Sequence, residues 1–367
     1  MIADLLRLRD RPRRIVGLNS GTSADGVDVA LVEIDGAGET TRARVLRFAK
    51  VPHPAALAAR LRAPLAAGEI ATLSFELARA FAAATRAVVG GEPFDLVASH
   101  GQTIAHHGRA GTLQIGEPAV LAEILGRPVV SGFRARDVAA GGEGAPLVPL
   151  ADYLLFRRPG ATLACQNLGG IANVTIVGDS LAATFAFDTG PGNMPLDEVA
   201  RRLGEPYDRG GARAAAGAVD EATVAELLRH PYFSRPPPRT TGREDFGAAF
   251  VEPLWARFGG RADDLLATLT RFVAVSIRDA YRRFCPRVDE VLVSGGGVDN
   301  ATLRRHLVAL FAPVPVRSTA ELGIDPGAKE ALAFAVLANQ TIHDLPGNVP
   351  AATGATGPRV LGAISPT

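Results

Sequence analysis

The chain has 367 residues, a length that predicts two domains, and its 47% hydrophobic and 21% charged residues are typical of a soluble globular protein rather than a disordered one. Its 39 basic and 38 acidic side chains almost cancel, which argues against a nucleic-acid partner, because that role needs a concentrated basic face. Only Lys50 and Lys329 are lysines, and neither follows a glycine-rich loop, so P-loop nucleotide chemistry is excluded.

The two cysteines and the terminal segments point to a cytoplasmic protein. Cys165 and Cys285 have neither CxxC spacing nor a histidine neighbour, so we expect no metal knuckle and no disulfide framework. Residues 1–14 lack the continuous apolar run of a signal peptide. No uncharged apolar run reaches about 18 residues, so we expect no membrane span.

The first half of the chain begins with a strand at residues 15–18, a turn of small residues at 19–26 and a second strand from Val27. Apolar residues at helical spacing predict a helix over 69–89. The segments that follow are strands at 94–99 and 128–131 and a loop at 132–149.

The second half repeats this opening. A strand at 162–166, a tight turn at 167–170 and a returning strand at 171–177 suggest two related halves. Further predicted elements are helices at 263–284 and 328–342 and a strand at 288–293 that ends in a run of glycines. Alternating strands and helices predict α/β layers.

The turn after the first strand favours phosphate binding. Its glycines allow close approach of backbone N–H groups, its hydroxyls can donate to phosphate oxygens, and Asp25 or Asp28 could hold Mg²⁺ through water. An ordinary hairpin turn uses the same residue types. The candidate residues are Gly21, Thr22, Ser23, Ala24, Asp25, Gly26, Val27 and Asp28, and in the second half Asn167, Gly169, Gly170 and Asn173. Two such turns facing each other would hold a triphosphate from both sides.

Asp188 comes at the end of a buried strand and before a glycine turn, so it is a candidate general base. The alternative is a cap of the following helix. Gly295, Gly296 and Gly297 could let a flat base lie against the backbone, but they fit a strand–helix turn equally well. Glu330 opens a helix, where acids are common.

Several polar residues are candidates for sugar binding. Zinc binding by His100, His106 and His107 has little support, because no HExxH motif or acid at ligand spacing is present. Hydrogen bonding to a sugar by His100, Gln102 and Thr103 is favoured. In the loop after them, Arg134 and Asp137 are further candidates, with plain solvent exposure as the alternative. The proline-rich connector at 231–241 fits a ligand contact and a surface loop equally well.

Taken together, these segments resemble the anhydro-N-acetylmuramic acid kinase family. The resemblance covers 15 to about 364 and rests on GTSADGVD (21–28), HGQT (100–103), QIGEP (114–118), GAPLVP (144–149), NLGGIAN (167–173), FDTGPGN (187–193), TGREDF (241–246), SGGG (294–297) and KEALAFA (329–335). In this order the motifs are highly specific. Departures from the family pattern are Asn19 and Ala24, where methionine and leucine are usual, Glu143 in place of glutamine, and Arg239-Thr240 where Lys-Ser is frequent.

The resemblance implies two RNase H-like domains, as in actin-like ATPases, around a central nucleotide and sugar cleft. It implies ATP, Mg²⁺ and water as reactants, opening of the 1,6-anhydro ring, and N-acetylmuramic acid 6-phosphate and ADP as products in peptidoglycan recycling. Asp188 would be the catalytic carboxylate, Glu330 an acid at the sugar, and Asp25 a magnesium ligand; Gly190 and Asn193 would contact substrate. A cytoplasmic homodimer follows from the same resemblance.

We expect an N-terminal extension at residues 1–13, a first domain at 14–140 with 343–367, and a second domain at 141–342. Two other functions stay open. One is a kinase for a different sugar or acid on the same scaffold, which would need a free hydroxyl acceptor. The other is a nucleotide-switched interaction module, which would turn over ATP without sugar or form filaments.

Overall fold

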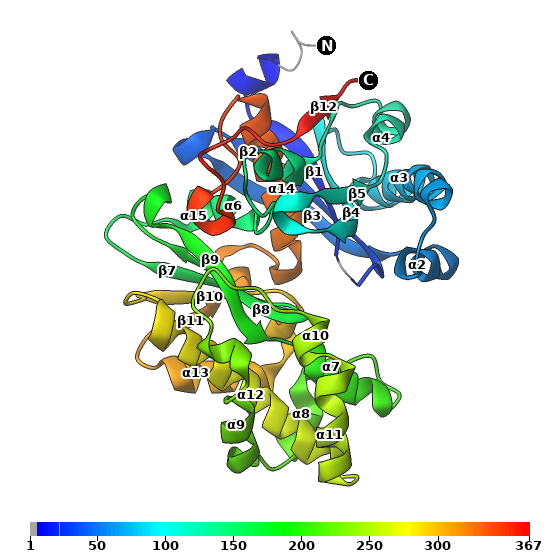
Figure 1. Ribbon diagram of the computed structural model, residues 1–367. Coiled ribbons are helices and arrows are strands. Elements are labelled where there is room, and N and C mark those ends of the chain that lie inside the picture. Colours follow the sequence, from blue (N-terminus) through cyan, green and yellow to red (C-terminus); the bar gives the residue numbers. More distant parts are fainter. Residues whose placement is uncertain (1–5, 22) are drawn as a thin grey trace. The chain divides into compact units, whose positions relative to one another are not determined.

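The computed structural model describes residues 6–21 and 23–367, and the chain divides into two compact units (Figure 1). The first unit contains the chain up to Phe156 together with Gly323–Thr367, and the second is Arg157–Leu322. The division differs from the predicted boundaries, because 141–156 and 323–342 join the first unit. The reason is that helix α14 (Lys329–Ile342) packs on strand β1 (Arg13–Ser20) and on helix α6 (Val148–Phe156).

One mixed sheet forms the centre of the first unit. Its seven strands among the described residues have the order β12-β6-β4-β1-β2-β3, with β5 paired to β4. Strand β2 is antiparallel to both of its neighbours, β1 and β3, whereas β4 runs parallel to β1 and β6 runs parallel to β4. The strands besides β1 are β2 (Gly26–Asp35), β3 (Arg42–Pro52), β4 (Leu96–His106), β5 (Thr112–Ile115), β6 (Val129–Ser131) and β12 (Ala363–Ser365).

Helices pack on this sheet, and a glycine allows close contact between β1 and α14. A Cβ atom at Gly17 would lie 2.0 Å from the Ala331 carbonyl oxygen, so α14 can meet β1 this closely only because residue 17 is glycine. The predicted helix at 69–89 is confirmed as α3 (Ala67–Val89), with Leu73, Leu77 and Phe81 buried. The other helical segments are η1 (Leu8–Asp10), η2 (Gly38–Thr40), α2 (Ala55–Arg62), η3 (Gly108–Ala110), α4 (Pro118–Leu125), α5 (Phe133–Ala139), η9 (Pro326–Ala328) and α15 (Pro350–Thr353).

The second unit repeats the strand order of the first. Its sheet reads β11-β10-β7-β8-β9, with β7, β8 and β9 antiparallel and β10 and β11 parallel to β7. The same path, β6-β4-β1-β2-β3, runs through the first sheet. This is the RNase H-like arrangement, so the predicted α/β class and the pair of related halves are confirmed. The strands are β7 (Leu163–Leu168), β8 (Ile171–Val177), β9 (Phe185–Pro191), β10 (Glu290–Ser294) and β11 (Val316–Ser318).

The long helix α12 (Ala262–Phe284) lies between two apolar clusters of the second unit. Val273 and Ile277 pack with the sheet, whereas Leu269 and Phe272 pack with the helices on the other side. The remaining helical segments are η4 (Leu181–Ala183), α7 (Met194–Arg202), η5 (Arg209–Gly211), α8 (Ala212–Ala216), α9 (Glu221–Leu227), η6 (Pro231–Ser234), α10 (Arg243–Phe246), α11 (Ala248–Phe258), η7 (Gly296–Asp299), α13 (Ala301–Phe311) and η8 (Thr319–Leu322).

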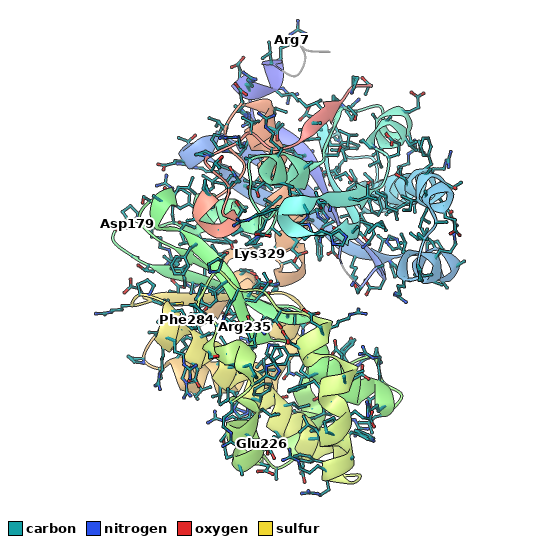
Figure 2. The ribbon with its side chains drawn as sticks, in the orientation of Figure 1. Arg7, Asp179, Glu226, Arg235, Phe284 and Lys329 are labelled. Carbon is teal, nitrogen blue, oxygen red and sulfur yellow. The ribbon has the colours of Figure 1, made fainter. Side chains whose placement is uncertain are left out.

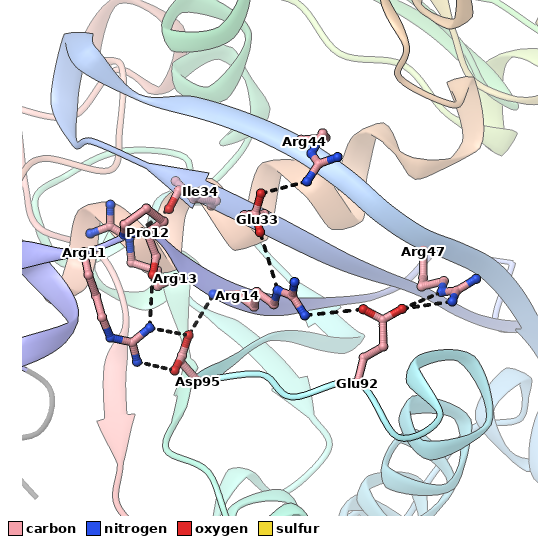
Figure 3. Close-up of polar contacts among 10 residues, drawn as sticks. All are labelled: Arg11, Pro12, Arg13, Arg14, Glu33, Ile34, Arg44, Arg47, Glu92 and Asp95. Carbon is pink, nitrogen blue, oxygen red and sulfur yellow. Dashed lines mark hydrogen bonds and ion pairs between the residues drawn. The ribbon is translucent and has the colours of Figure 1, made fainter.

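The described part of the predicted N-terminal extension is attached to the first unit. Leu8 is buried, and Arg11 Nη2 lies 2.6 Å from Asp95 Oδ1. Asp95 also accepts a hydrogen bond from the Arg14 amide, within a network that continues to Glu33 and Glu92 (Figure 3). Arg13 is 1% exposed and donates to the carbonyls of Leu8 and Gly36. Strand β1 therefore starts one residue earlier than the predicted domain.

Two further points concern the path of the chain. The segment 132–149 was predicted to be a loop, but it contains α5, because Phe133 and Asp137 are buried on one side of a helical turn. Among the helices of the described residues, none has the length and apolar character needed to cross a membrane.

Candidate functional site

Buried polar groups hold the turn between β1 and β2 by hydrogen bonds. The Ser20 hydroxyl lies 2.6 Å from Gln102 Oε1, and Gln102 Nε2 donates to the Gly21 carbonyl at 3.2 Å. Gln102 is 2% exposed, so it supports the turn, whereas we predicted that it binds sugar. Ala24 and Val27 have their side chains in the core and can offer a ligand only backbone groups.

Gly21 and Ser23 lie on the outer part of this turn, and Thr22 lies outside the described residues. A Cβ atom at Gly21 would meet nothing within 4 Å, so the backbone there is open to a ligand. Asp25 Oδ2 accepts from Lys50 Nζ at 2.9 Å and its Oδ1 accepts from Ser23 Oγ at 2.7 Å. Both oxygens of the predicted magnesium ligand therefore already have protein partners. The described residues contain no group of three or more His, Cys, Asp or Glu side chains that could hold a metal.

Two acids and an amide meet where β1, β2 and α14 come together. Asn19 is the cross-strand neighbour of Asp28, and Asn19 Nδ2 donates to Glu330 Oε2 at 2.6 Å. Burial raises the pKa of Asp28 to about 6; Lys50 opposes the shift, and the charge of Glu330 adds to it. Close packing of α14 at Gly17 therefore places Glu330 in a partly buried acidic cluster with Asp28.

The raised pKa of Asp28 predicts a variant that is more stable than the parent protein. Between pH 3.8, the ordinary pKa, and about 6, the unfolded chain ionises this carboxyl while the folded protein keeps it protonated, so stability falls as the pH rises. Asp28→Asn removes this cost and should add about 1–2 kcal/mol at pH 8, with a smaller gain at pH 5. Thermal unfolding at the two pH values measures the difference.

Asp25→Asn is the matched control with the opposite sign. Burial raises the pKa of Asp25, but Lys50 and Ser23 lower it further, so the net shift is downward. Asp25→Asn should therefore lose stability at pH 8. A gain for Asp28→Asn that is equal at both pH values would contradict burial of the charge as its origin.

A buried cation accompanies the acidic cluster. Arg134 Nε donates to His100 Nε2 at 2.9 Å, and its Nη1 donates to the Gly144 carbonyl at 2.8 Å. His100 Nδ1 lies 3.0 Å from the Gly101 carbonyl, so its proton is on Nδ1. Burial and the charge of Arg134 hold the pKa of His100 well below its ordinary value. Burial lowers the pKa of Arg134 to about 10, so this side chain is still a cation at neutral pH. The charge of Glu330 opposes the shift.

Two other predicted sugar contacts have internal partners. Asp137 is fully buried, and its carboxylate accepts hydrogen bonds from the Gly144 amide, Asn348 Nδ2 and Thr353 Oγ1 at 2.7–2.8 Å. Asp137 therefore joins α5 to the C-terminal segment, and its predicted role in sugar binding is wrong. Thr103 is partly exposed and accepts a weak hydrogen bond from Gln114 Nε2 at 3.3 Å.

In the second unit, three glycine segments pack against one another. A Cβ atom at Gly192 would lie 2.1 Å from the Gly169 carbonyl oxygen, and one at Gly297 would lie 2.7 Å from Leu168 Cβ. The Asn193 amide donates to the Gly169 carbonyl at 2.8 Å. The structure thus brings together the following predicted residues: Asn167, Gly169, Gly170, Asn193, Gly295, Gly296 and Gly297.

Gly296 and Gly190 differ in what surrounds them. A Cβ atom at Gly296 would meet nothing within 4 Å, as expected for a surface that a ligand could cover. At Gly190 it would lie 3.0 Å from Phe233 Cε1 and 3.2 Å from Ser276 Oγ, so this glycine serves packing rather than the predicted substrate contact. Asn173 is partly exposed, and its carbonyl accepts from Gln166 Nε2 at 2.9 Å.

Asp188 lies inside β9, so the alternative of a helix cap is wrong. Its Oδ2 accepts a hydrogen bond from the Thr241 amide at 3.0 Å. Burial raises the pKa of Asp188 to about 6, while the Thr241 N–H and the charge of Arg239 lower it. Most molecules therefore hold an ionised Asp188 at neutral pH, as a general base requires.

A family model described as anhydro-N-acetylmuramic acid kinase matches residues 13–367 of this chain. The anhydro-N-acetylmuramic acid kinase of Salinibacter ruber is 43% identical over 390 residues, covering 98% of this chain and 98% of that protein. The enzyme of the same name from Caldanaerobacter subterraneus is 42% identical over 392 residues, covering 98% and 99%. The chain belongs to the anhydro-N-acetylmuramic acid kinase family.

A solved structure adds a weaker similarity to this family member. The ROK family glucokinase from Streptomyces griseus, in complex with glucose and AMPPNP, is 17% identical over 89% of this chain and 99% of that one, with a TM-score of 0.39. At that score the likeness carries no argument about the site. The fold assignment rests on the strand order described above.

For this kinase family member, sequence reasoning missed several groups that shape the site. Asn19 was noted only as a departure, yet it donates to Glu330. Tyr232 and Arg239 hold the Asp188 carbonyl, and both come from the proline-rich connector. Burial also raises the pKa of Asp197, on α7, to about 6. The arginine after three prolines was the one signal that pointed to the connector.

Proposed function

We propose that the protein transfers the γ-phosphoryl group of ATP to O6 of 1,6-anhydro-N-acetylmuramic acid while water opens the anhydro ring. The products are N-acetylmuramic acid 6-phosphate and ADP. The observation that carries this proposal is the family match over 13–367, and the half-protonation of Asp188 near pH 6 supports it, because an aspartate base is then ionised at neutral pH.

The proposed chemistry needs a base for water. In the anhydro sugar O6 is bonded to C1, so no free 6-hydroxyl exists. Asp188 takes a proton from the water that attacks C1, and the C1–O6 electron pair moves to O6. O6 then attacks the γ-phosphorus, and ADP leaves. The hydroxyl from water stays on C1, so all atoms are accounted for.

The other proposed roles belong to the phosphate turns and the acidic cluster. Open backbone at Gly21 and Gly296 suits phosphate and nucleotide groups, which phosphoryl transfer stabilises by positioning and electrostatics. Glu330 would accept hydrogen bonds from the sugar hydroxyls. The buried cation Arg134 would suit the carboxylate of the sugar. Asp25 as a Mg²⁺ ligand would have to give up Lys50, so no step is assigned to the metal here.

The cellular setting follows from the family resemblance. We place the reaction in the cytoplasm, in peptidoglycan recycling, where ATP and a reducing environment are available to a protein whose cysteines are in the thiol form. We also propose a homodimer, which sedimentation at several protein concentrations would test.

Turnover in ¹⁸O-labelled water tests the reaction. We expect the label at C1 of the product sugar and none in phosphate. Label in phosphate would mean ATP hydrolysis and would overturn the proposal. Ordinary amino sugars are the matched substrates: faster ADP release with one of them would favour a different sugar kinase, and ADP release without sugar would favour a nucleotide-switched module.

A further inference from the structure

The connector, residues 231–241, hydrogen-bonds to Asp188 at its amide, its carbonyl and its carboxylate. The Asp188 amide donates to the Arg239 carbonyl at 3.2 Å. The Asp188 carbonyl accepts from Tyr232 Oη at 2.6 Å and from Arg239 Nε at 3.0 Å, and Thr241 N donates to Oδ2 at 3.0 Å. These partners lie 44 to 53 residues further along the chain, so the connector fixes Asp188 by long-range contacts.

Arg239 is the centre of this arrangement. It is 5% exposed, and its Nη1 and Nη2 donate to the carbonyls of Arg235 at 3.0 Å and Thr189 at 3.3 Å. Its guanidinium carbon lies 4.7, 4.8 and 5.5 Å from the ring centroids of Tyr232, Phe284 and Phe187. Aromatic faces stabilise a desolvated cation. The N–H groups of the planar guanidinium form a rigid fork, which fixes the carbonyls that it binds.

The charge of Arg239 favours the ionised form of Asp188. Among the described residues Arg239 forms no salt bridge, and Asp188 is the carboxylate whose charge it faces. Burial raises the pKa of Tyr232, and it raises the pKa of Cys285 to about 12, so both are neutral near pH 7. The other charged groups around this place are Arg235, Asp245 and Arg283.

We propose that Arg239 is a positioning residue for the reaction, which orients the Asp188 backbone and keeps its carboxylate ionised. This inference rests on the proposed function, in which Asp188 is the base. The backbone contacts set the direction of the carboxylate, and the positive charge of Arg239 opposes the desolvation that would otherwise protonate it. Arg239 itself does not touch the reacting atoms.

The test compares three variants in the full chain. Arg239→Gln removes the charge, Arg239→Lys keeps it without the fork, and Arg235→Gln removes an exposed arginine that lies 5.9 Å from the Tyr232 ring. For Arg239→Gln we expect kcat to fall about 10- to 100-fold with KM for the anhydro sugar within about threefold. The acid limb of the kcat–pH profile should move up by about 0.5–1 pH unit.

Arg239→Lys should restore the acid limb and only part of kcat, and Arg235→Gln should match the parent protein. An unchanged acid limb and kcat in Arg239→Gln would overturn the proposal. If that variant does not fold, Arg239→Lys decides, because parent-like kcat there would exclude a role for the fork. Failure of the proposed function is distinguishable, since the parent protein itself would then show no sugar-dependent ADP release.

Discussion

Asp188→Asn should lower turnover at least about 1,000-fold while the anhydro sugar still binds within a few-fold of its parent affinity. The amide has the shape of the carboxylate and can still accept the Thr241 hydrogen bond, but it cannot take a proton from water. In the parent protein, turnover should fall as the pH drops below about 6, because the base becomes protonated. ADP release gives kcat, and calorimetry gives the affinity for sugar.

The control for this prediction is Asp179→Asn, which changes an exposed carboxylate of the same unit (Figure 2). It should turn over normally. Normal turnover in Asp188→Asn would reject Asp188 as the base. If the acid limb survives in Asp188→Asn and disappears in Asp197→Asn, the base is Asp197, whose pKa burial raises to the same value of about 6.

Lys329→Met should destabilise the protein by roughly 3–5 kcal/mol. Lys329 Nζ lies 3.0 Å from Asp152 Oδ1, and the two side chains are 8% and 2% exposed. Without the lysine, the buried Asp152 carboxylate loses this partner, and keeping it in the folded protein costs free energy whether it is ionised or protonated. Urea unfolding measures the loss, and a matching fall in activity would reflect the position of Glu330 one residue further along α14.

The pair Lys50–Asp25 supplies the matched comparison. Lys50 is 51% exposed and Asp25 is 45% exposed, so Lys50→Met should cost no more than about 1 kcal/mol. The double variant Lys329→Met with Asp152→Leu should regain most of the stability, since no buried charge is then left without a partner. Equal losses for Lys50→Met and Lys329→Met would show that burial does not set the strength of these pairs.

Local pattern was enough to predict the layers and the repeated opening of the two halves. The α3 face and the strand-turn-strand starts at β1 and β7 were visible because their signals lie within 10–20 residues. The boundary of the units was not predictable in this way. Helix α14 packs on β1, more than 300 residues earlier in the chain, because Gly17 lets Ala331 approach closely. The sequence around either residue contains no signal that predicts this contact.

The same limit explains the errors at the site. Gln102 and Asp137 are polar residues in the expected neighbourhood, so composition alone could not separate them from ligand contacts. Asp137 is satisfied by Asn348 and Thr353, which are 211 and 216 residues away, and Gln102 by Ser20, 82 residues away. Asp188 was found because a carboxylate at a strand end before glycines is a local signal.

The scarcity of lysine also gives the folded protein unusual chemical selectivity. An activated ester acylates a lysine side chain only where the ε-amino group is accessible. Lys50 offers one, whereas the Lys329 side chain is closed in against Asp152. Because Lys50 is bound to Asp25 at the turn between β1 and β2, a dye coupled there would report on that turn. Without any mutation, a fluorescent probe on a lysine side chain would therefore be placed at Lys50 and not at Lys329.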